Sequence, residues 1–326
     1  MVNKQKNKIF IFLRNIIFLL TVLFLVLFLS HQLITFYEKD KYTPPGRLVE
    51  VNGKNMHIYT KGDGKDTIVL LSGLGTAAPH LDFAPLINDL AKNHKVVAVE
   101  IFGYGFSDLT NEGRTVENIV KEIRMGLKKA GIEGPYTLMP HSISGVYSMY
   151  YANKYPEEVK AIIGIDPTLP LSFEYFNESV PTMPGYMQYA APSGIARLII
   201  SINQKDYLPI AEAGTYSEEN IQKTKAISSW RGYNRNIVEE MKLISYNLDQ
   251  TKEMTFPDDK PVIIFTANDM ESDEDARARK DFYQLHLNNN PASEVIILEG
   301  HHYLHWTRYK EISKKVFSLT KDPETE

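Results

Sequence analysis

The amino-acid sequence predicts an α/β fold, in which an eight-stranded, mostly parallel sheet carries an inserted helical cap and is preceded by one transmembrane helix. Three observations lead to this prediction. Residues 16–36 form an uncharged apolar run, two strand-like segments flank Asn52-Gly53, and six further apolar runs alternate with helical patterns. Such alternation is typical of a parallel sheet that is covered by helices on both faces.

The apolar run of residues 16–36 is long enough to cross a bilayer, because a helix of this length spans about 31 Å. It is preceded by four basic residues and no acid: Lys4, Lys6, Lys8 and Arg14. This asymmetry predicts a single-pass protein of the cell membrane, with a cytoplasmic N-terminus and an extracytoplasmic body. A cleaved signal peptide is the alternative, but no small-x-small pair follows the run. A buried core helix fits less well, since such helices seldom have so long an apolar stretch.

The composition of the 326 residues excludes several classes of protein. The chain has no cysteine, which excludes a thiol nucleophile, a Cys-ligated zinc and an iron–sulfur cluster. Beyond residue 36 it carries 32 basic and 40 acidic residues, a balance that argues against a nucleic-acid partner. We expect no cofactor.

The strands are predicted from two kinds of pattern. RLVEV and MHIYTKG flank Asn52-Gly53, which is a strong hairpin signal. The six nearly continuous apolar runs are TIVLLSG, HKVVAVE, YTLMPHS, VKAIIGID, PVIIFTA and EVIILEG. The predicted division is residues 1–36 for the cytoplasmic N-terminus and anchor, 37–46 for a linker, 47–167 and 258–320 for the sheet domain, 168–257 for the cap, and 321–326 for a flexible tail.

The predicted cap has no strand-like run but contains three helical patterns, SGIARLIISI, EENIQKTKAISSW and NIVEEMKLISYNL. It is rich in aromatic residues and methionine, which we expect to join the cap to the sheet or to line an apolar pocket. These residues are Phe173, Tyr175, Phe176, Met183, Tyr186, Met187, Tyr189, Trp230 and Tyr233.

Ser142 occupies a sharp turn between a predicted strand and a predicted helix. The turn reads Met139-Pro140-His141-Ser142-Ile143-Ser144-Gly145 and leads into VYSMYYANKYP. A serine at such a nucleophile elbow has a strained backbone, and its Oγ projects above the sheet. Proline and serine replace the usual first and last glycines of the G-x-S-x-G pattern.

With these residues the chain resembles the α/β-hydrolase family. Ser72-Gly73-Leu74-Gly75 follows a strand where the family usually has His-Gly-x, and residues 100–108 resemble its D-x-x-G-x-G-x-S-D turn. The resemblance implies that the backbone N–H groups of Leu74 and Ile143 form an oxyanion hole. It also implies that residues 100–108 form a structural corner beside the site.

The resemblance implies the order serine, acid, histidine for a catalytic triad. Asp269 follows the seventh predicted strand in Phe265-Thr266-Ala267-Asn268-Asp269 and is the acid we expect; Asp166, at the end of the sixth strand, is the alternative. For the base we expect His302, because His302-Tyr303-Leu304-His305 matches the family's register. His301 is the alternative base.

The histidines also allow a metal interpretation, since His301 and His305 are four residues apart. The glutamate of H-E-x-x-H is missing and no distant ligand is evident, so we expect no metal.

The sequence therefore predicts a membrane-anchored serine hydrolase with Ser142, Asp269 and His302 as its triad. The expected substrate is a neutral, fairly apolar carboxylic ester or lactone, and the lipid bilayer is a partner through residues 16–36. Peptidase, thioesterase, acyltransferase and carbon–carbon hydrolase activities use the same triad and stay open. The alternative outside enzymes is a tethered, non-catalytic module that senses a ligand.

Overall fold

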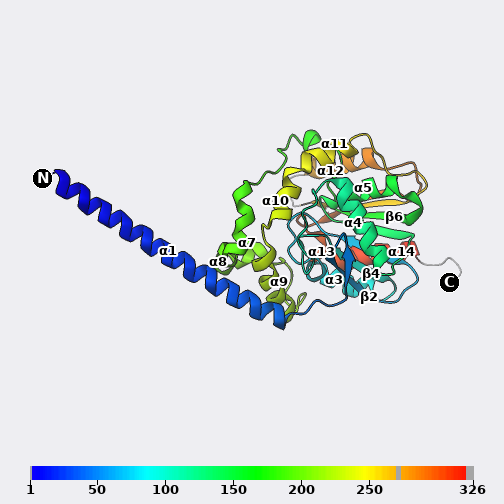
Figure 1. Ribbon diagram of the computed structural model, residues 1–326. Coiled ribbons are helices and arrows are strands. Elements are labelled where there is room, and N and C mark those ends of the chain that lie inside the picture. The colour runs from blue at the N-terminus through cyan, green and yellow to red at the C-terminus, as the bar shows by residue number, and fades with distance from the viewer. Residues whose placement is uncertain (1, 269–272, 321–326) are drawn as a thin grey trace.

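A long N-terminal helix projects from an α/β body in the computed structural model, which describes residues 2–268 and 273–320 (Figure 1). The helix, α1 (Val2–Lys41), runs from one end of the molecule to the body. Its segment Gln5–Lys41 has a mean hydropathy of 2.7 in its most apolar window, none of which is buried. By length and composition this helix can cross a membrane, although a signal sequence meets the same criteria.

The body is built on one eight-stranded sheet, as the sequence predicted. The strands are β1 (Arg47–Val51), β2 (Lys54–Lys61), β3 (Thr67–Leu71), β4 (Lys95–Glu100), β5 (Tyr136–Pro140), β6 (Val159–Ile165), β7 (Val262–Asn268) and β8 (Glu294–Glu299). Their order is β1-β2-β4-β3-β5-β6-β7-β8, and all pairs are parallel except β1–β2 and β2–β4. Asn52 and Gly53 both have positive φ, as the tight turn between β1 and β2 requires.

Helices cover both faces of the sheet. The helices outside the β6–β7 connection are α2 (Pro79–Asp82), α3 (Ala84–Leu90), α4 (Val116–Lys129), α5 (Ser144–Lys154), η1 (Pro156–Glu158), α12 (Asp273–His286), α13 (Leu304–Thr307) and α14 (Tyr309–Thr320). One buried cluster packs α4, α5 and α12 against one face, and a second packs α3 and α14 against the other. Buried on both sides, the central strands have the continuous apolar sequences noted above.

The chain between β6 and β7 is helical. Its elements are α6 (Ser172–Tyr175), η2 (Gly185–Tyr189), α7 (Ala190–Ser193), α8 (Ile195–Ile202), η3 (Gln204–Tyr207), α9 (Glu218–Arg231), α10 (Arg235–Lys242) and α11 (Ile244–Thr251). The third helical pattern of the sequence forms two helices, because the chain leaves helical geometry at Leu243 (φ −96°, ψ 4°). We call this segment the cap; its exact division from the sheet domain stays a prediction.

The C-terminal part of α1 is bound to the cap. The Glu38 carboxylate accepts hydrogen bonds from both terminal nitrogens of Arg197 (2.8 and 2.6 Å) and from Trp230 Nε1 (2.8 Å). Gln32 Nε2 donates to the carbonyl oxygen of Pro192 at 3.1 Å. The apolar helix is therefore attached to the body through side chains as well as through the chain itself.

Candidate active site

Ser142 lies in a strained turn between β5 and α5. Its φ is +53°, a value that non-glycine residues rarely adopt, and its side chain is half-buried. The Ser142 carbonyl oxygen accepts hydrogen bonds from the N–H groups of Gly145 (2.9 Å) and Thr168 (2.8 Å). The start of α5 and the segment that follows β6 thus hold the turn in this conformation.

The loop after β3 passes directly against Ser142. A Cβ on Gly73 would lie 3.0 Å from Ser142 Cβ and 2.8 Å from His141 Nδ1, so this approach requires glycine. The Ser144 hydroxyl donates to the Ser72 carbonyl oxygen at 2.6 Å and fixes the loop on the turn. Leu74 therefore lies in the loop beside Ser142, and Ile143 follows Ser142 in the chain.

His302 is paired with a buried carboxylate. His302 Nδ1 lies 2.7 Å from Asp166 Oδ2, while Asp166 Oδ1 accepts hydrogen bonds from Thr266 Oγ1 (3.1 Å) and the Ala267 N–H (3.0 Å). Asp166 was the alternative acid of the sequence prediction. The preferred acid, Asp269, lies outside the described residues.

The surroundings of Asp166 keep it ionised. Burial would raise the pKa of its carboxyl group, but the hydrogen bond and charge of His302 lower it. The Ala267 N–H and the Arg279 guanidinium, 3.9 Å away, act in the same direction, and the pKa is lower than the ordinary value. A buried carboxylate held in this way can orient the imidazole and stabilise its protonated form.

His141 joins the serine turn to the histidine loop. Its Nε2 donates to the His302 carbonyl oxygen at 3.2 Å, and the two rings are 4.7 Å apart. Burial, together with the positive charges that neighbouring histidines can acquire, lowers the pKa of His141 well below its ordinary value. A neutral His141 can therefore hold the backbone of His302 without adding charge to the site.

The other histidines of the loop have different partners. His305 is buried and its Nε2 lies 2.6 Å from Asp82 Oδ2, whose other oxygen accepts from Trp306 Nε1. His301 Nδ1 accepts the Tyr303 N–H at 3.0 Å. Of the two adjacent candidates for the base, His302 is the one whose carboxylate contact the described residues show. Each of these two rings keeps a second nitrogen outside these hydrogen bonds, so the expectation of no metal at His301 and His305 stays a prediction.

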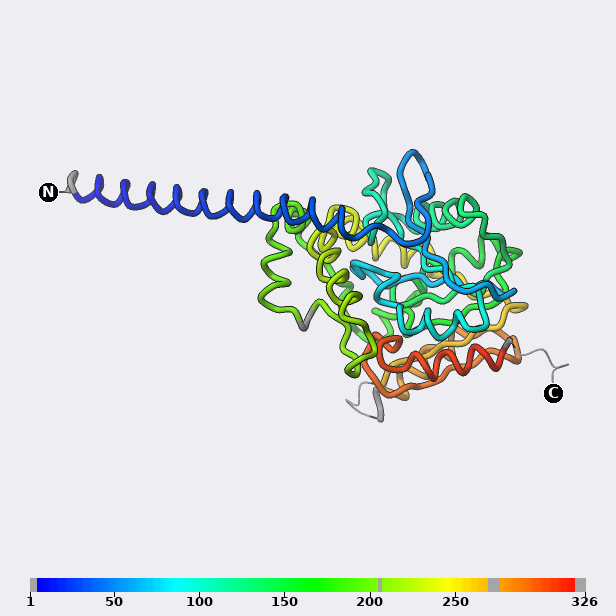
Figure 2. Tube along the Cα trace, turned by 90° about the horizontal axis from the view of Figure 1, so that it is seen from below, coloured from blue at the N-terminus to red at the C-terminus, as the bar shows by residue number. Residues whose placement is uncertain are grey.

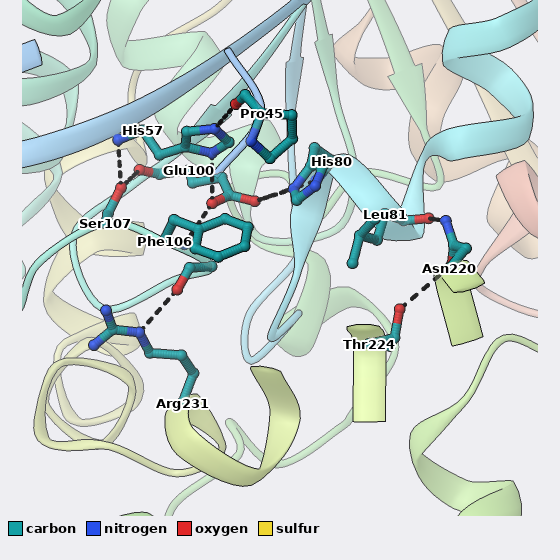
Figure 3. A network of polar contacts seen from close by, with 11 residues as sticks. Pro45, His57, His80, Leu81, Glu100, Phe106, Ser107, Asn220, Thr224 and Arg231 are labelled. Atoms are coloured by element: carbon teal, nitrogen blue, oxygen red, sulfur yellow. Dashed lines mark hydrogen bonds and ion pairs between the residues drawn. The ribbon is translucent and has the colours of Figure 1, made fainter. Parts of the chain in front are cut away.

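The corner of residues 100–108 contains a second, buried histidine–carboxylate cluster (Figure 3). Glu100 Oε2 lies 2.8 Å from His57 Nδ1 and accepts the Phe106 N–H at 2.7 Å, and Glu100 Oε1 lies 2.7 Å from His80 Nδ1. His57 Nε2 contacts the carbonyl oxygen of Pro45. The cluster fastens β2, α2 and the segment after α1 to the end of β4.

The same corner binds the cap. Arg231 Nε donates to the Gly105 carbonyl oxygen (2.8 Å), and Asn234 Nδ2 donates to that of Gly103 (2.7 Å). Glu240 of α10 accepts hydrogen bonds from the hydroxyls of Tyr104 (3.0 Å) and Tyr147 (2.7 Å). These bonds position the cap over the site.

His57, His80 and Glu100 also have the spacing of metal ligands, with one donor atom of each within 4.8 Å of the others. However, each histidine Nδ1 already contacts its own oxygen of Glu100 at hydrogen-bond distance. The two Nδ1 atoms and the Glu100 carboxylate thus satisfy one another, and we interpret the cluster as structural.

A cavity of about 270 Å³ lies between the cap and the sheet. Leu74 and Tyr303, neighbours of the site in the chain, form part of its wall. Other lining residues come from the cap: Met183, Ala196, Ile200, Tyr233, Ile237 and Met241. Two of the predicted aromatic and methionine residues of the cap, Met183 and Tyr233, therefore face the cavity. Two others, Phe173 and Phe176, pack on the main core.

Sequence reasoning missed two residues of the site. His141 was noted only as part of the turn, and Asp82 was not considered. A histidine directly before a serine at a strand end is a signal that could have been used. Asp82 lies in a short helix outside the motifs, and its pairing with His305, 223 residues away, comes from the fold alone.

Comparisons of the sequence identify its relatives. A family profile described as the alpha/beta hydrolase fold matches residues 66–309. An uncharacterized protein of Bacillus subtilis (strain 168), YbdG, is 32% identical over 289 residues, which cover 82% of this chain and 83% of that protein. A cis-3-alkyl-4-alkyloxetan-2-one decarboxylase of Shewanella oneidensis is 24% identical over 115 residues, 34% of this chain and 35% of that protein.

Solved structures share the fold. Epoxide hydrolase VrEH1 from Vigna radiata matches with a TM-score of 0.63 and 19% identity, covering 84% of this chain and 96% of that one. A serine hydrolase involved in carbazole degradation, the CarC enzyme, matches with a TM-score of 0.58 and 16% identity, covering 84% and 97%. These likenesses extend over nearly the whole of each solved chain.

Proposed function

Because the chain belongs to the α/β-hydrolase family, we propose that it is a membrane-anchored serine hydrolase that cleaves a neutral, fairly apolar carboxylic ester or lactone. One observation carries the proposal. The strained serine turn is joined through His141 to the loop of His302, whose ring is paired with the buried Asp166. A serine, a histidine and a carboxylate in this arrangement are the parts that acyl transfer needs.

In the proposed reaction the oxygen of Ser142 attacks the ester carbonyl while His302 accepts the serine proton. The N–H groups of Leu74 and Ile143 stabilise the oxyanion. The carbon–oxygen bond of the ester then breaks, the alcohol leaves with the proton from His302, and the acyl group stays on Ser142. Water, deprotonated by His302, hydrolyses this acyl-enzyme and releases a carboxylic acid.

We propose Asp166 as the acid of this triad. It is buried, ionised and 2.7 Å from His302 Nδ1, and it keeps the chain order of serine, acid and histidine. Its strand end is adjacent to that of β7, since Ile165 pairs with Phe265. An acid after either strand reaches the same edge of the sheet, so the order of residues alone did not separate Asp166 from Asp269.

One feature supports an apolar substrate, and another supports acyl transfer as the reaction. The cavity that adjoins the site is lined mainly by aliphatic and aromatic residues. Epoxide opening in this fold uses an aspartate as the nucleophile. A serine at the elbow therefore favours acyl transfer.

We further propose that α1 is an uncleaved anchor. Its most apolar window is exposed, and its C-terminal part is bound to the cap through Glu38 and Gln32. Cleavage of a signal peptide would remove part of α1, the helix that makes these contacts with the cap. Mass spectrometry of the membrane-extracted protein would test this proposal, which expects residues 16–36 in the intact chain.

A series of p-nitrophenyl esters of increasing acyl length tests the hydrolase. The full chain in detergent micelles should hydrolyse the shorter esters, and the Ser142→Ala variant should not. Folded wild-type protein that hydrolyses none of them would favour the non-catalytic sensor instead.

A further inference from the structure

Helix α8 of the cap exposes apolar residues on one side and lines the cavity with the other. Ala196 and Ile200 are buried and face the cavity. Ile195, Leu198 and Ile202 recur at helical spacing on the other side and are 41, 45 and 78% exposed. Side chains of α8 thus form a single layer between the cavity and the outside.

The start of α8 lies next to the apolar helix. Figure 2 shows the green segment that contains α8 running crosswise to α1, along the side of the body from which the N-terminal half of α1 projects. A Cβ on Gly194, which precedes α8, would lie 2.7 Å from His31 Cβ and 3.4 Å from the Leu27 carbonyl oxygen. The first turn of α8 is therefore at the level of residues 27–31 of α1, inside the uncharged run.

Both helices expose apolar residues at this level. Leu29 and Leu33 of α1 are exposed, as are Leu198 and Ile202 of α8. Tyr37, Tyr186 and Tyr189, in α1 and in η2 just before α7, are also exposed. Tyrosine is enriched where proteins cross the membrane–water boundary. Arg197, the charged residue of α8, is bound to Glu38 of α1.

We propose that α8 lies in the surface of the outer leaflet and that the substrate is a membrane-resident ester that enters the cavity past this helix. The inference rests on the proposed hydrolase and anchor, and it names the source of the substrate. If α1 spans the bilayer, its docking to the cap brings α8 to the lipid boundary. An amphipathic helix at that boundary buries its apolar side among the acyl chains.

The position of α8 is tested with single cysteines, which the cysteine-free chain makes unambiguous. Ile202→Cys and, as a matched control, Leu319→Cys are labelled with the polarity-sensitive fluorophore NBD. The full chain is then placed in vesicles of phosphatidylcholine and phosphatidylglycerol. Leu319 is exposed at the end of α14. Figure 1 shows α14 on the opposite side of the body from α1.

The label at position 202 should fluoresce as in an apolar medium and be quenched by spin-labelled lipids, whereas the label at 319 should report water. A label at 202 that also reports water would overturn the proposal. So would an apolar signal that lipid does not quench and that grows with protein density, because a second copy of the chain would then cover α8.

The source of the substrate is tested by comparing the rates of hydrolysis of a membrane-embedded ester and a soluble ester. The Leu198→Asn/Ile202→Asn variant should lose about tenfold in the rate on a long-chain fluorogenic ester embedded in the vesicles, while its rate on p-nitrophenyl butyrate in water stays unchanged. Equal rates of wild type and variant on both esters would contradict the proposal. If wild-type protein does not hydrolyse the soluble ester, the proposed hydrolase activity is contradicted instead. The NBD fluorescence would still report the position of α8.

Discussion

The pair of His302 and Asp166 and the cluster of His57, His80 and Glu100 consist of the same kinds of side chain at nearly the same distances. Nδ1–carboxylate separations are 2.7 Å in the first and 2.8 and 2.7 Å in the second. They differ in exposure, because 44% of the His302 side chain is accessible while His57 and His80 are 0 and 4% accessible. A histidine that transfers protons to a substrate must have one side accessible to that substrate. Exposure therefore distinguishes the proposed catalytic pair from the structural cluster.

The largest effect expected from this comparison is on catalysis at His302. His302→Ala should lower kcat on p-nitrophenyl butyrate by about 10⁴-fold or more, because the proton acceptor for Ser142 is removed. His301→Ala is the matched control and should change kcat by less than about threefold. The reverse result would assign the base to His301.

The next effect concerns the acid. Asp166→Asn should lower kcat by roughly 10³-fold, because an amide neither fixes the tautomer of His302 nor stabilises its protonated ring. Asp269→Asn, measured by the same steady-state assay, should retain most of the activity. Loss of activity in Asp269→Asn but not in Asp166→Asn would restore the acid that the sequence favoured.

The buried cluster should act on stability instead. Glu100→Gln should lower the free energy of unfolding by about 3–5 kcal/mol, since it leaves buried hydrogen-bonding groups with an uncharged partner. Denaturant unfolding followed by circular dichroism measures this change. The folded fraction of the variant should keep kcat within a few-fold of wild type, and a catalytic loss as large as that of His302→Ala would erase the distinction between the two sites.

The smallest expected effect is the pH dependence of that stability. Two histidines lower the pKa of Glu100 against the cost of burial, so its contribution is present above the ordinary value of 4.5 and is lost as the pH falls. Burial lowers the pKa of His57, but the charge and hydrogen bond of Glu100 and the Pro45 carbonyl together raise it above its ordinary value. The contribution of His57 is therefore present below 6.5 and is lost as the pH rises. The stability difference between wild type and Glu100→Gln should therefore be greatest from about pH 4.5 to 6.5. A difference that is constant with pH would mean that the cluster carries no proton-linked stability.

Much of the fold was predictable because it depends on local patterns. Continuous apolar runs marked the central strands, Asn52-Gly53 marked the hairpin, and the long interval after Asp166 marked the helical segment. The break between α10 and α11 at Leu243 was not visible, since helical periodicity continues across it.

The site was harder to predict because its partners are distant in the chain. Ser142 could be named from its turn, whereas the contact between His302 and Asp166 joins residues 136 positions apart. The same limit applies to Glu100, which was predicted to be part of a structural corner but whose two histidine partners come from other elements.

The identity of the nucleophile tests the central claim most directly. The full chain is treated with a fluorophosphonate probe, and the modified peptide is located by mass spectrometry. We expect a single adduct on Ser142 that is absent from Ser142→Ala and strongly reduced in His302→Ala. An adduct on another residue, or folded wild-type protein that stays unlabelled, would contradict it.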